Sequence, residues 1–346
     1  MNAALPLGHT PPTLDALSRP LLDVRISLLD QCNFRCPYCM PAGISLNAMV
    51  RRKDWLTAGE IERFVRTAVD HGVRKVRLTG GEPLLRTDLE EIIARIARVD
   101  ATLDLALTTN GALLAGRARA LRDAGLHRLT ISLDALDPQR FREMSGGRGE
   151  VSTILDAIES AERAGFSPLK INCVMERGRN EDQVLVLARH FRGTPHTLRF
   201  IEYMDAGTCN GWRREQVVPS VELRDRIAAV WPLSPVQASR RGEVATRWRY
   251  VDGLGEIGFI SSISQPFCGD CTRLRLGADG RLYTCLFARS GTDVRALLAE
   301  GCEQALSVRL GSLWRGRRDR YSELRDNPSS TAPPLPERVE MYRVGG

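Results

Sequence analysis

Short apolar runs alternate with longer amphipathic stretches along the first 205 residues of the chain. Six of the apolar runs have the length of buried strands, and they cover residues 25–29, 75–79, 103–108, 129–133, 170–175 and 197–203. The stretches between them repeat apolar residues with a helical period. Strands that alternate with helices at this spacing predict a parallel sheet with right-handed crossovers.

Capping residues mark several of the predicted helix starts. Thr57 and Glu60 have the spacing of a capping box in front of an apolar stripe. Asp137, which a proline follows, is expected to be an N-cap, and Asn180 is expected to cap a helix over 181–191. These signals place helices between successive predicted strands, as crossover connections require.

The turns after the predicted strands carry glycine and polar residues. They read Gly80-Gly81-Glu82-Pro83, Thr109-Asn110-Gly111 and Ser132-Leu133-Asp134. Because the carboxyl ends of parallel strands lie at one face, the turns predict an active site there, as in α/β barrels. An open, flavodoxin-like sheet is the alternative architecture. Six units without a dinucleotide-binding fingerprint favour an incomplete, TIM-like (β/α)6 barrel.

The pattern changes after about residue 206. A helix is expected over 221–230, and two short strands, 244–251 and 256–262, are expected to form an antiparallel segment. Four prolines and three Ser or Thr residues mark 326–337 as a linker. The predicted organisation is an N-terminal arm (1–20), a partial barrel (21–235), a smaller C-terminal α+β segment (236–325), and a linker with a Gly-Gly tail (326–346).

Composition narrows the range of partners. Of the 49 basic residues only Lys53, Lys75 and Lys170 are lysines, and the formal net charge is +7. Such a charge suits a nucleic acid or a polyanionic small molecule, but the basic residues are dispersed among acids.

No apolar run has the length of a membrane span, and the first residues lack the pattern of a signal peptide. Nine cysteines in such a chain indicate reduced thiols and predict a cytoplasmic protein without a membrane partner.

Three cysteines follow the first predicted strand. Cys32, Cys36 and Cys39 have the spacing C-x3-C-x2-C, Tyr38 precedes the last of them, and no fourth cysteine follows before Cys173. Three thiolates can hold three irons of a [4Fe–4S] cluster and leave the fourth iron open. A zinc loop, or three unrelated buried thiols, is the alternative interpretation. The triad resembles that of the radical S-adenosylmethionine (SAM) superfamily, in which the open iron binds SAM.

A second triad lies far along the chain. Cys268, Cys271 and Cys285 have the spacing C-x2-C-x13-C, and no histidine lies within this segment. A second [4Fe–4S] cluster with an open iron is the favoured interpretation. The alternative is a structural zinc site completed by a distant residue such as Cys302.

Together the two triads, the Gly-Gly-Glu-Pro turn, the Arg-Leu-Arg run after Cys271 and the terminal Gly-Gly resemble the MoaA family, the GTP 3′,8-cyclases of molybdenum cofactor biosynthesis. The resemblance covers residues 25–287 and the last residues of the chain. It implies a 5′-deoxyadenosyl radical that removes hydrogen from C3′ of GTP. The implied product is (8S)-3′,8-cyclo-7,8-dihydroguanosine 5′-triphosphate.

The resemblance also assigns the site residues. It implies that the first triad and the second triad each bind a [4Fe–4S] cluster, and that the second cluster holds the purine. The SAM contacts are expected at Tyr38, Gly81, Ser132 and Met204. The GTP contacts are expected at Arg25, Arg77, Thr108, Lys170, Arg273, Leu274 and Arg275. The Gly345-Gly346 tail is expected to enter the active site.

The residues themselves support part of this assignment. A triphosphate requires several converging cations, and arginine offers two parallel donors. Arg273 and Arg275 share one face of their segment, and Lys170 starts a strand in a chain with few lysines. Lys75 is a weaker candidate on the same ground, and Lys53 is expected at the surface. For any single arginine, a solvated ion pair is the alternative.

The remaining expectations concern partners and competing functions. The resemblance implies a homodimer, an electron donor such as flavodoxin or ferredoxin, and a downstream molybdopterin-precursor synthase. Cys173, Cys209 and Cys302 are expected to be small buried residues or incidental thiols. A radical SAM peptide maturase with an auxiliary cluster is the alternative enzyme. A zinc-containing nucleic-acid binder is the alternative outside enzymes, although no nucleic-acid partner is expected.

Overall fold

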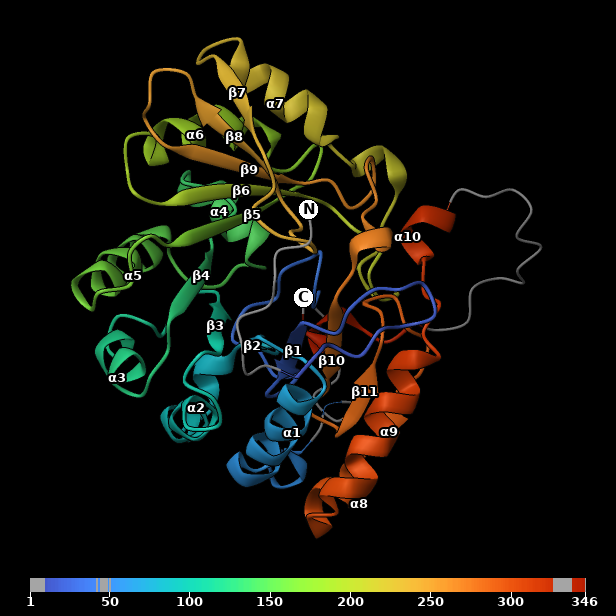
Figure 1. Ribbon diagram of the computed structural model, residues 1–346. Coiled ribbons are helices and arrows are strands. Elements are labelled where there is room, and N and C mark those ends of the chain that lie inside the picture. Colours follow the sequence, from blue (N-terminus) through green and yellow to red (C-terminus); the bar gives the residue numbers. More distant parts are fainter. Residues whose placement is uncertain (1–9, 42, 44–48, 50, 326–337, 346) are drawn as a thin grey trace.

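A continuous curved sheet organises the molecule (Figure 1). The computed structural model describes residues 10–41, 43, 49, 51–325 and 338–345, and within them this sheet has twelve strands in the order β12-β11-β10-β1-β2-β3-β4-β5-β6-β9-β8-β7. From β10 to β9 all neighbouring strands are parallel. The six strands predicted from the sequence form the middle of this parallel run. They are β1 (Asp23–Ser27), β2 (Lys75–Thr79), β3 (Asp104–Thr109), β4 (Arg128–Ser132), β5 (Lys170–Met175) and β6 (Thr197–Glu202).

Helices connect these strands along the outer side of the sheet (Figure 1). They are α1 (Ala58–Asp70), α2 (Leu89–Ala97), α3 (Ala118–Asp123), α4 (Pro138–Met144), α5 (Val151–Arg163), α6 (Val184–Phe191) and α7 (Ser220–Ala228). The predicted partial (β/α)6 barrel is therefore confirmed. Its core lies between the helices and the outward side chains of the strands, where Val24, Ile61 and Phe64 are fully buried.

The caps follow the sequence signals with one exception. Thr57 and Glu60 form the predicted capping box at α1, and the Asp137 side chain accepts a hydrogen bond from the Arg140 amide at α4. The prediction for Asn180 is wrong, because its side chain donates to the carbonyl oxygens of Asp134 and Val174 instead of capping the helix. This amide bridges the ends of β4 and β5, so a buried tertiary contact replaces the local one.

The C-terminal segment extends both edges of the barrel sheet. At one edge β10 (Arg273–Leu276) pairs in parallel with β1, followed outward by antiparallel β11 (Arg281–Tyr283) and β12 (Thr292–Asp293). At the other edge β9 (Glu256–Ile260) pairs in parallel with β6, followed by antiparallel β8 (Thr246–Tyr250) and β7 (Leu233–Val236). The predicted antiparallel pairing of β8 with β9 is confirmed. The expected division after residue 235 falls within β7 and stays a prediction.

Residues 288–325, in which no sequence motif was recognised, are mostly helical. They contain α8 (Arg295–Glu300), α9 (Glu303–Arg315) and α10 (Tyr321–Leu324), and α8 and α9 pack beside α1 (Figure 1). Trp314 of α9 is fully buried in the main core. The predicted linker at 326–337 lies outside the described residues. Within the described part of the chain, no helix is long and apolar enough to cross a membrane.

The described tail, residues 338–345, returns to the sheet. It forms the short helix α11 (Met341–Val344), which lies against β1. Two side-chain contacts hold the first residues of this tail. Arg338 Nη1 lies 3.0 Å from Asp205 Oδ2, and Glu340 accepts a 2.7 Å hydrogen bond from Thr208 Oγ1. The tail is therefore fixed to the loop that follows β6.

Candidate active site

The first cysteine triad lines a cavity at the carboxyl ends of the barrel strands. The turns after β2, β3, β4 and β6 contribute to the same cavity, here called the first-triad cavity. Its lining includes all four residues predicted to contact SAM, which are Tyr38, Gly81, Ser132 and Met204. The structure thus brings together residues that lie up to 172 positions apart in the sequence, between Cys32 and Met204.

Backbone hydrogen bonds join the cysteine loop to the Gly-Gly turn. The amide of Gly81 donates to the Leu29 carbonyl at 2.7 Å, and the amide of Glu82 donates to the Gln31 carbonyl at 2.8 Å. A Cβ atom at Gly81 would lie 2.0 Å from the Gln31 oxygen. Only glycine permits this approach, so the turn fixes the entry of the cysteine loop by close backbone contact.

The Glu82 carboxylate is buried between the ends of β2 and β3. It accepts hydrogen bonds from the Thr109 hydroxyl at 2.7 Å and from the amides of Leu84 and Asn110 at 2.9 and 2.8 Å. Burial raises its pKa to about 7, although these hydrogen bonds lower it. Glu82 therefore ties two active-site turns together.

Tyr38 connects the cysteine loop with the opposite strands. Its hydroxyl donates to Asp134 Oδ2 at 2.7 Å, and Asp134 Oδ1 accepts from the Val174 amide at 2.8 Å. Burial raises the pKa of Asp134 to about 6 despite these bonds. The Tyr38 ring is thereby oriented within the first-triad cavity.

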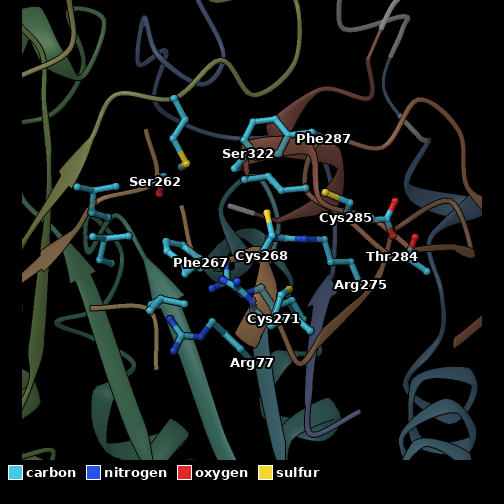
Figure 2. Close-up of a pocket in the computed structure, with 18 of the residues that line it drawn as sticks. Arg77, Ser262, Phe267, Cys268, Cys271, Arg275, Thr284, Cys285, Phe287 and Ser322 are labelled. Atoms are coloured by element: carbon cyan, nitrogen blue, oxygen red, sulfur yellow. The ribbon is translucent and has the colours of Figure 1, made fainter. Parts of the chain in front are cut away.

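The second triad lines a neighbouring cavity. Cys268, Cys271 and Cys285 surround it together with arginines from the barrel strands, as Figure 2 shows for Arg77 and Arg275. This second-triad cavity shares Asn172, Ile201 and Met204 with the first-triad cavity. The two cysteine sites therefore open toward each other across the middle of β5 and the carboxyl half of β6.

Arginines stand side by side across the inner face of the sheet. Arg275, Arg25 and Arg77 are in register on β10, β1 and β2, and Arg273 lies two residues before Arg275 on the same face. The Nε atoms of Arg25 and Arg77 have no hydrogen-bond partner within the described residues. Guanidinium donors that lack partners inside a barrel form a preorganised site for a polyanion.

The basic side chains lower each other's pKa values. Burial, followed by repulsion from Arg275, Arg77 and Arg273, lowers the pKa of Arg25 well below its usual range. Burial and neighbouring cations also lower the pKa of Lys170 to about 7 and that of Lys75 to about 8. Burial and mutual repulsion therefore both disfavour the charged forms of these side chains in the free site.

Comparison with known proteins decides the family. The sequence matches the Radical SAM superfamily model over residues 26–191 and the Molybdenum Cofactor Synthesis C model over residues 196–323. It is 56% identical over 347 aligned positions to a GTP 3′,8-cyclase of Xanthomonas campestris pv. campestris (strain B100), with 99% of this chain and 100% of the relative covered. The chain belongs to the GTP 3′,8-cyclase family.

More distant relatives support the same assignment. A GTP 3′,8-cyclase of Acidothermus cellulolyticus is 46% identical to this chain, with 97% of this chain and 100% of the relative covered. A GTP 3′,8-cyclase of Aquifex aeolicus is 43% identical, with 96% of this chain and 99% of the relative covered. Streptococcus suis SuiB bound to S-adenosylmethionine has a similar structure, with a TM-score of 0.61 and 16% identity over 85% of this chain and 68% of SuiB. At this identity the likeness to SuiB shows the fold alone.

The other residues expected to contact GTP have different surroundings in this cyclase-family chain. Thr108 lines the first-triad cavity and accepts a hydrogen bond from Arg77 Nη1 at 3.3 Å. Leu274 is fully buried in the hydrophobic core, on the opposite face of β10 from its two arginine neighbours. Lys170 lies at the start of β5, among cations of β2, β4 and β6. Lys53 is exposed, as predicted.

Sequence reasoning missed Arg199. This β6 residue lines the second-triad cavity, is 6% exposed and donates from Nη2 to Asn172 Oδ1 at 2.6 Å. Gly258 on β9 lies in register with it, and a Cβ there would approach Arg199 Cγ to 3.1 Å. Its alternation with the apolar Leu198 and Phe200 along the strand was the available signal, but it did not distinguish Arg199 among 46 arginines.

The cysteines fit iron–sulfur clusters. All six triad thiols are free, and each set of three faces one cavity. Polar hydrogens already point at the sulfurs, because the Phe34 amide lies 3.4 Å from Cys32 Sγ and Arg317 Nη2 lies 3.0 Å from Cys271 Sγ. Such donors accompany cluster thiolates in proteins. No three His, Cys, Asp or Glu side chains in the described ranges are spaced to hold a single metal ion.

The other three cysteines differ in their surroundings. Cys173 is fully buried and Cys302 is exposed. Cys209 lies beside the first triad, where its Sγ is 3.7 Å from the Cys39 carbonyl oxygen and 2.9 Å from Glu340 Oε2. Cys209 therefore belongs to the contact between the tail and the cysteine loop.

Proposed function

We propose that this protein converts GTP into (8S)-3′,8-cyclo-7,8-dihydroguanosine 5′-triphosphate by radical SAM chemistry, as an early step of molybdenum cofactor biosynthesis. The observation that carries the proposal is the meeting of two cysteine-lined cavities at Asn172, Ile201 and Met204, with unpaired guanidinium donors in the second. The names of the relatives agree with it. One cavity would hold SAM and the other GTP.

The first-triad cavity has the features that SAM requires. Cys32, Cys36 and Cys39 would hold a [4Fe–4S] cluster with one open iron, and the turn at Gly81 offers backbone polar groups beside it. Tyr38, fixed by Asp134, offers an aromatic surface to the adenine. Ser132 and Met204 complete the opposite wall. When bound, this cluster and SAM would supply a 5′-deoxyadenosyl radical for hydrogen removal at C3′ of the ribose.

The second-triad cavity has the charge that a nucleoside triphosphate requires. Arg25, Arg77, Arg273 and Arg275 would bind phosphate oxygens, and Arg199 is added to the residues inferred from the sequence. Lys75 and Lys170 lie among the same cations and would strengthen the site when a polyanion offsets their mutual repulsion. Leu274 would act through its backbone or by setting the spacing of its neighbours, since its side chain is in the core.

The main contributions of the chain itself are to position the substrate and to exclude water from the site. A triphosphate held by cations of β1, β2, β6 and β10 would leave the ribose near the wall that both cavities share. The tail closes this region, because Met341 lines the first-triad cavity and Arg275 donates to the Val344 carbonyl at 3.1 Å. A bound ribose would thus meet SAM inside an enclosed site.

Further proposals concern the second cluster and the partners. Cys268, Cys271 and Cys285 would hold a [4Fe–4S] cluster whose open iron binds the purine. An electron donor such as flavodoxin or ferredoxin, a downstream molybdopterin-precursor synthase, a homodimer and a cytoplasmic location are also proposed. The peptide-maturase alternative gains no specific support, because the likeness to SuiB is a likeness of fold.

Anaerobic turnover tests the main proposal. Protein reconstituted with iron and sulfide would be incubated with SAM, GTP and dithionite, and the products would be separated by chromatography and identified by mass and NMR. The expected result is one 5′-deoxyadenosine for each cyclised GTP, with deuterium from C3′ of labelled GTP in the deoxyadenosine. GTP-independent SAM cleavage without any cyclised nucleotide would contradict the proposal.

A further inference from the structure

Arg317 lines the second-triad cavity and, like Arg273, makes a side-chain hydrogen bond to Cys271. Arg317 follows α9 and is 4% exposed, and its Nη2 donates to Cys271 Sγ at 3.0 Å. Its other donors bind the carbonyl oxygens of Cys271 at 2.9 Å and Thr284 at 3.0 Å. Arg25, Arg77 and Arg199 each have an unbound Nε instead. Arg317 is therefore committed to the cysteine loops.

Two separate parts of the chain fix this arginine. From the C-terminal side, its guanidinium lies 4.6 Å from the ring centroid of the buried Trp314. From the N-terminal arm, Asp15 Oδ2 lies 3.3 Å from Arg317 Nη1 and 2.6 Å from Arg19 Nε. Arg19 in turn donates to the Cys268 carbonyl at 2.8 Å. The result is a fully buried chain of charges, Arg19–Asp15–Arg317, that ends at the sulfur of Cys271.

We propose that Arg317 is a positioning residue that raises the reduction potential of the second cluster through Cys271, and that Asp15 moderates this effect. The inference rests on the proposed second cluster at Cys268, Cys271 and Cys285. It gives a role to the arm and to the α8–α9 segment, which contribute no cysteine to either triad.

The direction of the effect follows from charge. Reduction adds an electron to a cluster, and a nearby cation with an N–H···S bond stabilises the added negative charge. Arg317 provides both at 3.0 Å from an almost fully buried side chain, where electrostatic interactions are less screened than at the surface. Asp15 has the opposite charge on the far side of the same guanidinium. Removing Arg317 should therefore lower the potential, and neutralising Asp15 should raise it.

The test is a redox titration of the full-length protein with both clusters reconstituted, followed by EPR. The signal of the second cluster is the one that disappears in Cys271→Ala. Arg317→Gln should shift the midpoint of this signal to lower potential, and Asp15→Asn should shift it to higher potential. Arg318→Gln is the matched control, because it removes the same charge from the exposed neighbouring residue and should leave the midpoint unchanged.

The other outcomes are equally informative. An unshifted midpoint in Arg317→Gln with full iron content would overturn the inference, as would an equal shift in Arg318→Gln. If Arg317→Gln loses the cluster, Arg317→Lys carries the test, because it keeps the charge but not the planar donor, and an intermediate midpoint is expected. A wild-type protein with only one cluster would overturn the proposed second cluster itself, before any variant is compared.

Discussion

Arg275 donates a hydrogen bond to the carbonyl oxygen of Gly345, the last described residue of the chain. The same arginine lines the second-triad cavity, beside Arg25 on the neighbouring strand. The tail and the proposed substrate site therefore share one guanidinium. Because this contact uses the backbone of Gly345, the identity of the residue matters only through the space around it.

A side chain at Gly345 should disturb that arrangement. Its φ is +70°, and a Cβ would lie 2.2 Å from Thr79 Cγ2 on β2. We expect Gly345→Ala to lower the rate of GTP cyclisation by about tenfold, since overpacking of this kind costs about 1–3 kcal/mol. Steady-state product formation measures the effect. Gly116→Ala, with nothing within 4 Å of the added Cβ, is the control and should be as active as wild type.

Lys170 should make GTP binding depend on pH. Burial, followed by Arg199, Lys75, Arg77 and Arg128, lowers its pKa to about 7 in the free protein. A bound triphosphate favours the protonated amine, so binding takes up a proton and affinity falls as pH rises above 7. Between pH 7 and 8 the loss from this group is about fivefold, as the protonated fraction decreases.

Calorimetry in buffers of different ionisation enthalpy measures this proton uptake. In Lys170→Arg the guanidinium stays charged, so the contribution of this residue to the pH dependence should vanish while binding near pH 7 is retained. An identical pH profile in wild type and Lys170→Arg would show that Lys170 does not contact the phosphates.

Gly258 should control the position of Arg199. We expect Gly258→Val to raise the KM for GTP about tenfold without changing SAM binding, because the new side chain would displace the Arg199 stem at 3.1 Å. Arg199→Ala should have a similar effect. The double variant should be little worse than either single variant, since both remove the same interaction. Full additivity of the two defects would contradict this coupling.

The two cysteine triads should differ in function. Cys36→Ala should abolish SAM cleavage altogether, because it removes a ligand of the proposed SAM-binding cluster. Cys271→Ala should retain SAM cleavage in the absence of GTP but lose cyclisation. Assays of 5′-deoxyadenosine and of cyclised nucleotide separate these outcomes. Equal loss of both reactions in Cys271→Ala would indicate that the second triad serves folding.

The sequence predicted the parts of the fold that depend on local patterns. The six central strands and the caps at Thr57 and Asp137 follow from periodicity and from side-chain hydrogen bonds within one turn. The parallel pairing of β10 with β1 could not be predicted, because it joins residues about 250 positions apart without a local signal. Asn180 was assigned wrongly for the same reason, since its partners are tertiary.

In the candidate site, too, the features with a local sequence signal could be predicted, and those that depend on tertiary contacts could not. The triads were visible because cysteine spacing is rare, and the Gly80-Gly81 turn because it follows a strand. Arg199 and Arg317 were not distinguishable among 46 arginines. Their importance depends on burial and on contacts that form only in the folded chain. Arg199 binds Asn172, and Arg317 binds Cys271.

The position of β9 and β10 at opposite edges of the barrel sheet has a consequence for folding. Without residues 236–345, β1 and β6 would each present a row of unpaired backbone amides and carbonyls to solvent. Exposed parallel edges recruit strands from other chains, so a fragment that ends near residue 235 should aggregate. By covering both of these edges, the C-terminal part should protect the radical SAM half from self-association.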